Sequence, residues 1–130
     1  MLLGLKTDNP LAEIVLCGSA GEVIEKVDWQ ADRTLAHHLL RQLADLLTRH
    51  GGTFHDLTGL IVFKGPGSFT GLRIGLSVMN TLAYSEGVAI VGTGGDDWLK
   101  DGLARLARGE NDQVVLPEYG ADARITKPKK

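Results

Sequence analysis

One segment organises the chain: Gly65-Pro66-Gly67-Ser68-Phe69-Thr70-Gly71-Leu72-Arg73-Ile74-Gly75. It follows an apolar run typical of a strand, residues 60–63, and leads into a segment with helical spacing. Glycine loses more conformational entropy on folding than any other residue. Glycines gathered around one serine, one threonine and one arginine therefore indicate that backbone shape matters at this point.

A strand, a glycine-rich turn and a helix start together suggest an anion site, because unpaired amides and the helix dipole favour negative charge there. The sequence, however, matches neither of two common phosphate-binding motifs. The P-loop pattern GxxxxGK[ST] needs a lysine where this chain has Leu72. The dinucleotide pattern GxGxxG is replaced by GxGxxxG over Gly65, Gly67 and Gly71. The structural alternative is a tight turn in which Ser68 caps the helix and the glycines allow close packing.

Hydrophobic periodicity predicts the element order β-β-β-α-β-α-β-α. The expected strands are Met1–Leu5, Leu11–Cys17, Glu22–Val27, Thr58–Phe63 and Val88–Val91, and the expected helices are 34–50, 69–85 and a third that Asp96 caps and that runs through Ala107. Val114-Val115-Leu116 is a last apolar fragment. Three meander strands followed by βα units match a ribonuclease-H-like core, the half-domain of actin-like (ASKHA) ATPases. We therefore expect an α/β fold with a mixed five-stranded sheet.

The composition is that of a globular domain: 130 residues, of which 43% are hydrophobic and 23% charged. The 14 basic and 16 acidic residues give a net charge of −2, which predicts no general attraction to nucleic acid or membranes. A single cysteine, Cys17, excludes an internal disulfide and fits the cytoplasm, and no apolar run approaches the length of a membrane span. Residues 1–110 are expected to form one lobe, and 111–130 a C-terminal segment with a basic tail.

The residue patterns that would indicate a metal site or a catalytic nucleophile are weak. His37 and His38 are adjacent, so they point about 100° apart on a helix and do not form the metal pair of HExxH. Ser68 lacks the far-side glycine of the GxSxG nucleophile pattern, and no Cys/His cluster has zinc spacing. We expect Asp96 and Asp97 to be a helix cap and its neighbour.

GPGSFTGLRIG closely resembles the signature of the TsaB (YeaZ) family, which belongs to bacterial tRNA threonylcarbamoyladenosine biosynthesis. The setting is similar too, since His37-His38-Leu39-Leu40 lies on a helix before it, and residues 88–92 and 97–99 resemble the family's next strand and helix start. The resemblance implies an actin-like ATPase fold and a non-catalytic scaffold subunit. Its partners would be a TsaD-type paralogue, which holds the metal and transfers the threonylcarbamoyl group, and a TsaE-type ATPase. Contact with tRNA would be indirect.

Two departures from the family pattern bear on activity. The family's opening strand usually ends Ile-Asp-Thr-Ser, whereas this chain reads Leu5-Lys6-Thr7-Asp8. A lysine thus stands where catalytic relatives hold a nucleotide-bound metal. We expect no catalytic residue, metal or cofactor of its own, with ATP only at a junction with partner subunits. The family's second lobe is expected to be largely absent.

The resemblance also implies pairing through the first two helices, which carry apolar residues beyond a single stripe. The expected partner interface is His37, Leu40, Leu43, Leu47, Leu76, Met79, Ala83 and Tyr84. The same face would give a homodimer when the partner is absent. Two alternatives stay open: a small nucleotide-binding ATPase or phosphotransferase that uses the Gly65 loop, and a dimerising regulatory paralogue outside the pathway.

Overall fold

The computed structural model describes residues 1–67 and 69–118. Its strands and α-helices are β1 (Leu2–Lys6), β2 (Leu11–Cys17), β3 (Val23–Gln30), α1 (Leu35–Arg49), β4 (Gly59–Phe63), α2 (Phe69–Glu86), β5 (Ala89–Thr93) and α3 (Trp98–Ala107). This order confirms the predicted β-β-β-α-β-α-β-α. Short 3-10 turns at Asp32–Thr34 and Phe54–Asp56 are additions to it. Within the described ranges, no helix is long and apolar enough to cross a membrane.

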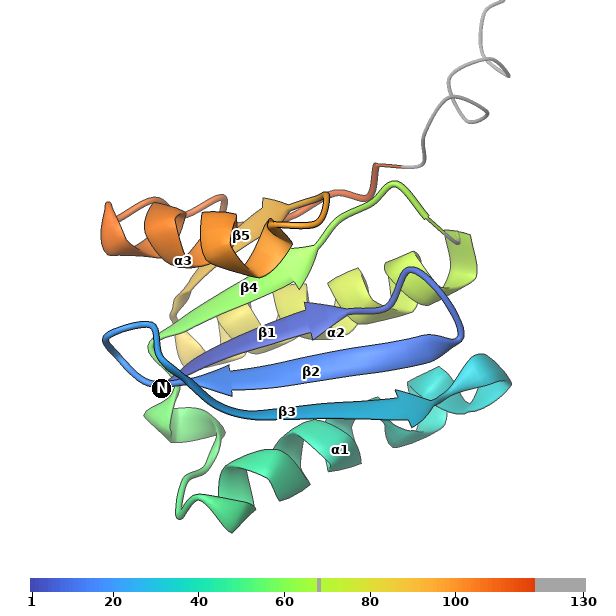
Figure 1. The fold of residues 1–130 in the computed structure, drawn as a ribbon, viewed down its shortest axis with the longest axis horizontal. Helices are drawn as coiled ribbons and strands as arrows, with labels where there is room; N and C mark the ends of the chain where they lie inside the picture. The colour runs from blue at the N-terminus through green and yellow to red at the C-terminus, as the bar shows by residue number, and fades with distance from the viewer. Residues whose placement is uncertain (68, 119–130) are drawn as a thin grey trace, which may run out of the picture.

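The five strands form one mixed sheet in the order β3-β2-β1-β4-β5 (Figure 1). The meander pairs β1 with β2 and β2 with β3 antiparallel, while β4 pairs parallel with both β1 and β5. This is the expected ribonuclease-H-like, actin-like half-domain. β3 continues beyond the predicted end at Val27 to Gln30, because its last residues still pair with the start of β2.

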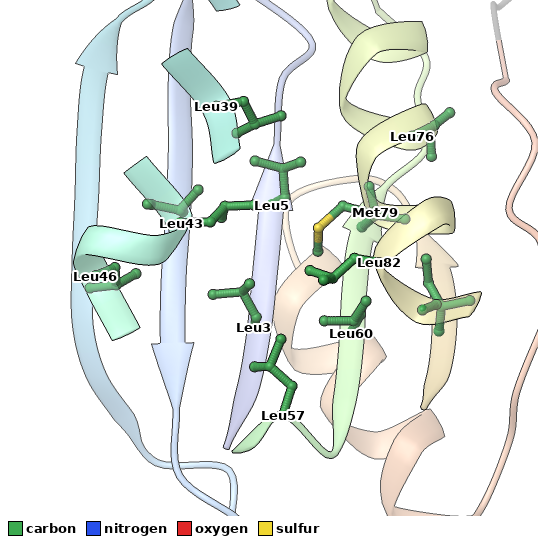
Figure 2. Packing of buried hydrophobic residues seen from close by; sticks show 14 of the residues in the cluster. Leu3, Leu5, Leu39, Leu43, Leu46, Leu57, Leu60, Leu76, Met79 and Leu82 are labelled. Atoms are coloured by element: carbon green, nitrogen blue, oxygen red, sulfur yellow. The ribbon is translucent and has the colours of Figure 1, made fainter. Parts of the chain in front are cut away.

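Helices cover both faces of the sheet, with α1 and α2 on one side and α3 on the other (Figure 1). β4 shows the division: Leu60 and Val62 join the core under α1 and α2, whereas Ile61 and Phe63 join the core under α3. The continuous apolar run of β4 is therefore buried on both faces, which is typical of a strand covered by helices on both sides. Figure 2 shows the larger core, in which leucines of β1 and β4 meet leucines of α1 and the methionine of α2.

The start of α3 differs from the prediction. The helix begins at Trp98 with Asp97 at the N-cap position, and Asp97 makes no capping hydrogen bond through its side chain, so the expected cap at Asp96 is wrong. The first turn is tied to the sheet instead, because the Thr93 hydroxyl donates to the Trp98 carbonyl at 2.6 Å. Thr93, at the end of β5, therefore anchors the first turn of α3 in place of a side-chain cap.

Candidate functional site

The glycine-rich loop joins β4 to α2 at the carboxyl end of the parallel strands, beside the turn that leaves β1. Ligands of open α/β sheets bind at this edge, so it is the natural place to look for a phosphate site. The Ser68 cap that the sequence predicted lies outside the described residues. The remainder of the loop shows what the glycines contact.

The glycines leave room for the turn that follows β1, because they have no side chains. A Cβ placed on Gly67 would lie 2.5 Å from the Cβ of Asp8, and one on Gly75 would strike the hydroxyl of Thr7. That hydroxyl is buried and donates to the Gly71 carbonyl at 2.8 Å. The close packing that the structural alternative predicted is therefore present, and it brings α2 against the end of β1.

The charges at this edge form a local ion pair. The Lys6 ammonium lies 2.6 Å from a carboxylate oxygen of Asp8 and 4.7 Å from the centre of the Phe63 ring. Asp8 in turn packs against Gly67. Each of these charges is neutralised by the other, so the pair offers neither a free ammonium to a phosphate nor a free carboxylate to a divalent cation. Within residues 1–67 and 69–118, no cluster of three or more His, Cys, Asp or Glu could hold a metal ion.

The predicted partner residues divide into two groups. Five of the eight are buried in the core beneath α1 and α2: Leu43, Leu47, Leu76, Met79 and Ala83. They contribute no exposed surface, which corrects the expectation that they line a docking face. The other three, His37, Leu40 and Tyr84, are exposed, and the exposed fractions of the two apolar side chains are 53% for Leu40 and 91% for Tyr84.

A hollow of about 490 Å³ lies between the first turn of α1, at Ala36, and the first half of α2. Its α2 wall consists of Thr70, Arg73, Ile74, Ser77 and Val78. A second hollow, which shares Thr70 and Ile74, continues toward the β1–β2 turn. The hollow could not be predicted from the sequence, because its shape depends on how the two helices pack together.

Two exposed apolar residues lie on the same helices, one or two turns beyond the hollow. Leu40 follows Ala36 by four residues, so it lies one turn further along the same side of α1. Tyr84 follows Ser77 by seven residues, so it lies two turns further along the same side of α2. The hollow, Leu40 and Tyr84 together are called the helical face below.

The far end of α1 is fixed by charged groups. Glu25 of β3 lies 3.0 Å from the Arg49 guanidinium and 2.7 Å from the His50 ring, at the end of the helix. The hydrogen bond from Arg49, followed by that of His50, holds the pKa of Glu25 below its usual range. This contact links the end of α1 to the edge strand β3.

Comparison with known proteins places these features in a family. Residues 27–94, just over half of the chain and including the whole glycine-rich segment, match the family model described as TsaD: tRNA N6-adenosine threonylcarbamoyltransferase. The tRNA threonylcarbamoyladenosine biosynthesis protein TsaB of Escherichia coli is 31% identical, over 69% of this chain and 43% of that protein. The protein of the same name from Bacillus subtilis is 51% identical over 35 residues, which are 27% of this chain and 15% of that protein.

The solved structures agree. YeaZ from Pseudomonas aeruginosa superposes with a TM-score of 0.66 and 27% sequence identity, over 72% of this chain and 43% of that chain. This chain spans less than half of the length of the curated relatives that it matches. The fold, the glycine-rich segment and these likenesses together show that the chain belongs to the TsaB (YeaZ) family, within the wider group that the TsaD family model describes.

Proposed function

We propose that this chain is a non-catalytic partner subunit in tRNA threonylcarbamoyladenosine biosynthesis and that it binds a TsaD-type paralogue through the helical face. The pathway is the one in the names of its relatives. A TsaE-type ATPase would join the pair, and tRNA would be contacted only through the partners. The cytoplasm is the compartment we propose, in keeping with the single unpaired Cys17.

The observation that carries the proposal is the exposure of Leu40 and Tyr84 on the two helices that flank a hollow. Each is a large side chain that the chain leaves in water, although both lie on helices whose other sides are buried. Aromatic and aliphatic anchors around a depression are typical of the centre of a protein interface. The core leucines beneath this face make it a rigid surface for a helix of the partner.

A scaffold role also agrees with the charges at the glycine-rich loop. The pair of Lys6 and Asp8 occupies the edge of the sheet at which a nucleotide and its metal would be expected. ATP would then bind only at a junction with partner subunits. In the absence of a partner, two copies would associate through the helical face.

Co-expression with a TsaD-type partner tests the proposal. Leu40→Glu and Tyr84→Glu each place a charge on the helical face, and we expect each to weaken the complex by about 2 kcal/mol or more, roughly thirtyfold in Kd. Ile24→Glu is the matched control, since Ile24 is an exposed apolar residue of β3 and belongs to neither helix. Light scattering on the chain alone tests the homodimer. Partner binding that is equal in all three variants would refute the proposed face.

The ATPase or phosphotransferase remains an alternative, and so does a regulatory paralogue outside the pathway. Titration with ATP and magnesium decides the first, because turnover by the isolated chain would contradict a scaffold role. Failure of the folded, partner-binding chain to support tRNA modification in a reconstituted system would favour the second.

A further inference from the structure

After α3 the chain returns along the outer edge of β5 as residues 110–118, which we call the strap. It belongs to neither a helix nor a strand. The backbone amide of Asp112 donates to the Ile90 carbonyl at 2.8 Å, and that of Glu118 donates to the Lys64 carbonyl at 2.7 Å. The strap therefore runs from β5 to the start of the glycine-rich loop.

Side chains complete the pairing of the β5 edge. Asn111 accepts from the Ile90 amide at 3.1 Å, and Asp112 accepts from the Gly92 amide at 2.8 Å. Arg105 of α3 donates to the Gly92 carbonyl at 3.0 Å. These backbone groups face outward from the sheet, where an exposed strand edge would offer them to another chain. The strap covers this edge without forming a sixth strand, because Gln113 has φ +69° and the Val114 amide donates to the Asp112 carbonyl at 2.7 Å.

Two contacts hold the middle of the strap. One is the Asn80 side chain, which we call the clamp, and the other is the space beside Gly92, which we call the Gly92 pocket. The Asn80 side chain of α2 donates to the Val115 carbonyl at 2.9 Å and accepts from the Val115 amide at 2.8 Å. The Val115 side chain is 3% exposed, and it fills the space that a Cβ on Gly92 would take. Both neighbours of Val115, Val114 and Leu116, are exposed. One buried side chain and a set of backbone hydrogen bonds thus hold the segment.

An ion-pair network holds one end of the strap, and a close backbone contact with Gly65 holds the other. Arg105 donates to both Asp112 and Glu110. The hydrogen bond from Arg105, together with one from the Gly92 amide, holds the pKa of Asp112 below its usual range. At the other end, Gly65 has φ +128°, and a Cβ there would collide with the Glu118 carbonyl. Glycine is required at this position both by its conformation and by the strap that crosses it.

We propose that the β5 edge, Asn80 and the Gly92 pocket form a binding site for a peptide that turns at the residue after its carboxylate, as the strap does at Gln113. The chain fills this site with its own strap, and the strap of a second copy enters it when the first is released. The site recognises main chain through the β5 edge and the Asn80 clamp. It selects a carboxylate three residues before a β-branched apolar residue, the spacing of Asp112 and Val115. The strap of a second copy carries that same pattern. The site is independent of the helical face.

Release is feasible because the strap contributes little to the core. Elements with few buried apolar contacts open at lower free energy than the global fold. The tethered strap competes at an effective concentration in the millimolar range. A second polypeptide therefore gains access only when the attachment of the strap is weakened.

The test uses the full chain with Asp112→Ala and Val115→Asp, two changes in the strap that leave the groove intact. A fluorescein-labelled peptide with the sequence of residues 110–118 is added, and binding is followed by fluorescence anisotropy. We expect the variant to bind the peptide at least about tenfold more tightly than the unaltered chain, in which the tethered strap competes. Hydrogen exchange of the Ile90 and Gly92 amides should accelerate in the variant and slow again with peptide.

Two controls make the result specific. Gly92→Val, added to the strap variant, fills the pocket and should abolish peptide binding, and a peptide that carries Val115→Asp should not bind. The proposal is overturned if the variant binds no peptide, or if its Ile90 and Gly92 amides stay as protected as before. It is also overturned if the amides of β1 and β4 lose protection, since the strap would then be inseparable from the fold.

Discussion

Leu43→Ala distinguishes a core leucine from an interface leucine. The Leu43 side chain is fully buried, in the same cluster as Leu5 and Leu39 (Figure 2). Truncating a buried leucine removes its transfer free energy and leaves a cavity, which together cost about 2–5 kcal/mol. That is a large share of the roughly 5–15 kcal/mol that stabilises a typical domain. For a chain of this size it lowers Tm by about 10–20 °C.

Urea and thermal unfolding, followed by circular dichroism, measure this change. Leu40→Ala is the matched control on the same helix, because the Leu40 side chain is half exposed and its truncation should cost less than about 1 kcal/mol. A Leu43→Ala chain as stable as the unaltered one, yet weaker in partner binding, would refute the placement of Leu43 in the core. It would mean that α1 turns a different side to the sheet.

Two further predictions concern the end of β1 and the strap. Thr7→Val removes the hydroxyl that donates to the Gly71 carbonyl but keeps the shape of the side chain, so we expect a loss of about 1 kcal/mol in urea unfolding with an unchanged m value. An equally stable variant would show that this bond does not tie β1 to α2. The strap should loosen in acid: bonding to Arg105 lowers the folded pKa of Asp112, so its stabilisation is complete above the unfolded pKa of about 4 and is lost as pH falls through the folded value. Exchange of the strap amides between pH 5 and about pH 3 measures this. Asp112→Asn should reduce the pH dependence but not abolish it, because the pKa of Glu110 is lowered by the same arginine; an unchanged dependence would contradict a role for Asp112.

The sequence predicted the elements and their order because hydrophobic periodicity is local. It was less successful with the helical faces. The leucines of α1 recur on a stripe broad enough to include Leu40, Leu43 and Leu47, and periodicity alone does not show where the buried part of that stripe ends. The packing of α1 against the sheet and α2 decides it: Leu43 and Leu47 are buried and Leu40 is exposed.

The strap could not be predicted for a different reason. Its fixed points lie far away in sequence, since Asn80 binds Val115 across 35 positions and Lys64 binds Glu118 across a longer interval. Neither contact leaves a periodic pattern, and the segment has no regular secondary structure. The only local sign was the apolar fragment 114–116, of which just one residue is buried.

The glycine-rich segment acquires a physical role from these contacts. Two parts of the chain that are distant in sequence converge on it. The turn after β1 approaches two glycines, with Asp8 at Gly67 and Thr7 at Gly75, and the strap approaches a third, with the Glu118 carbonyl at Gly65. A phosphate loop keeps its glycines so that amides can reach a ligand. Here the space beside the glycines is taken by the protein itself, with a carboxylate among the neighbours. The same residues that suggest a nucleotide site therefore hold β1, α2 and the strap together, which accounts for a glycine-rich turn in a subunit whose proposed task is to bind other polypeptides.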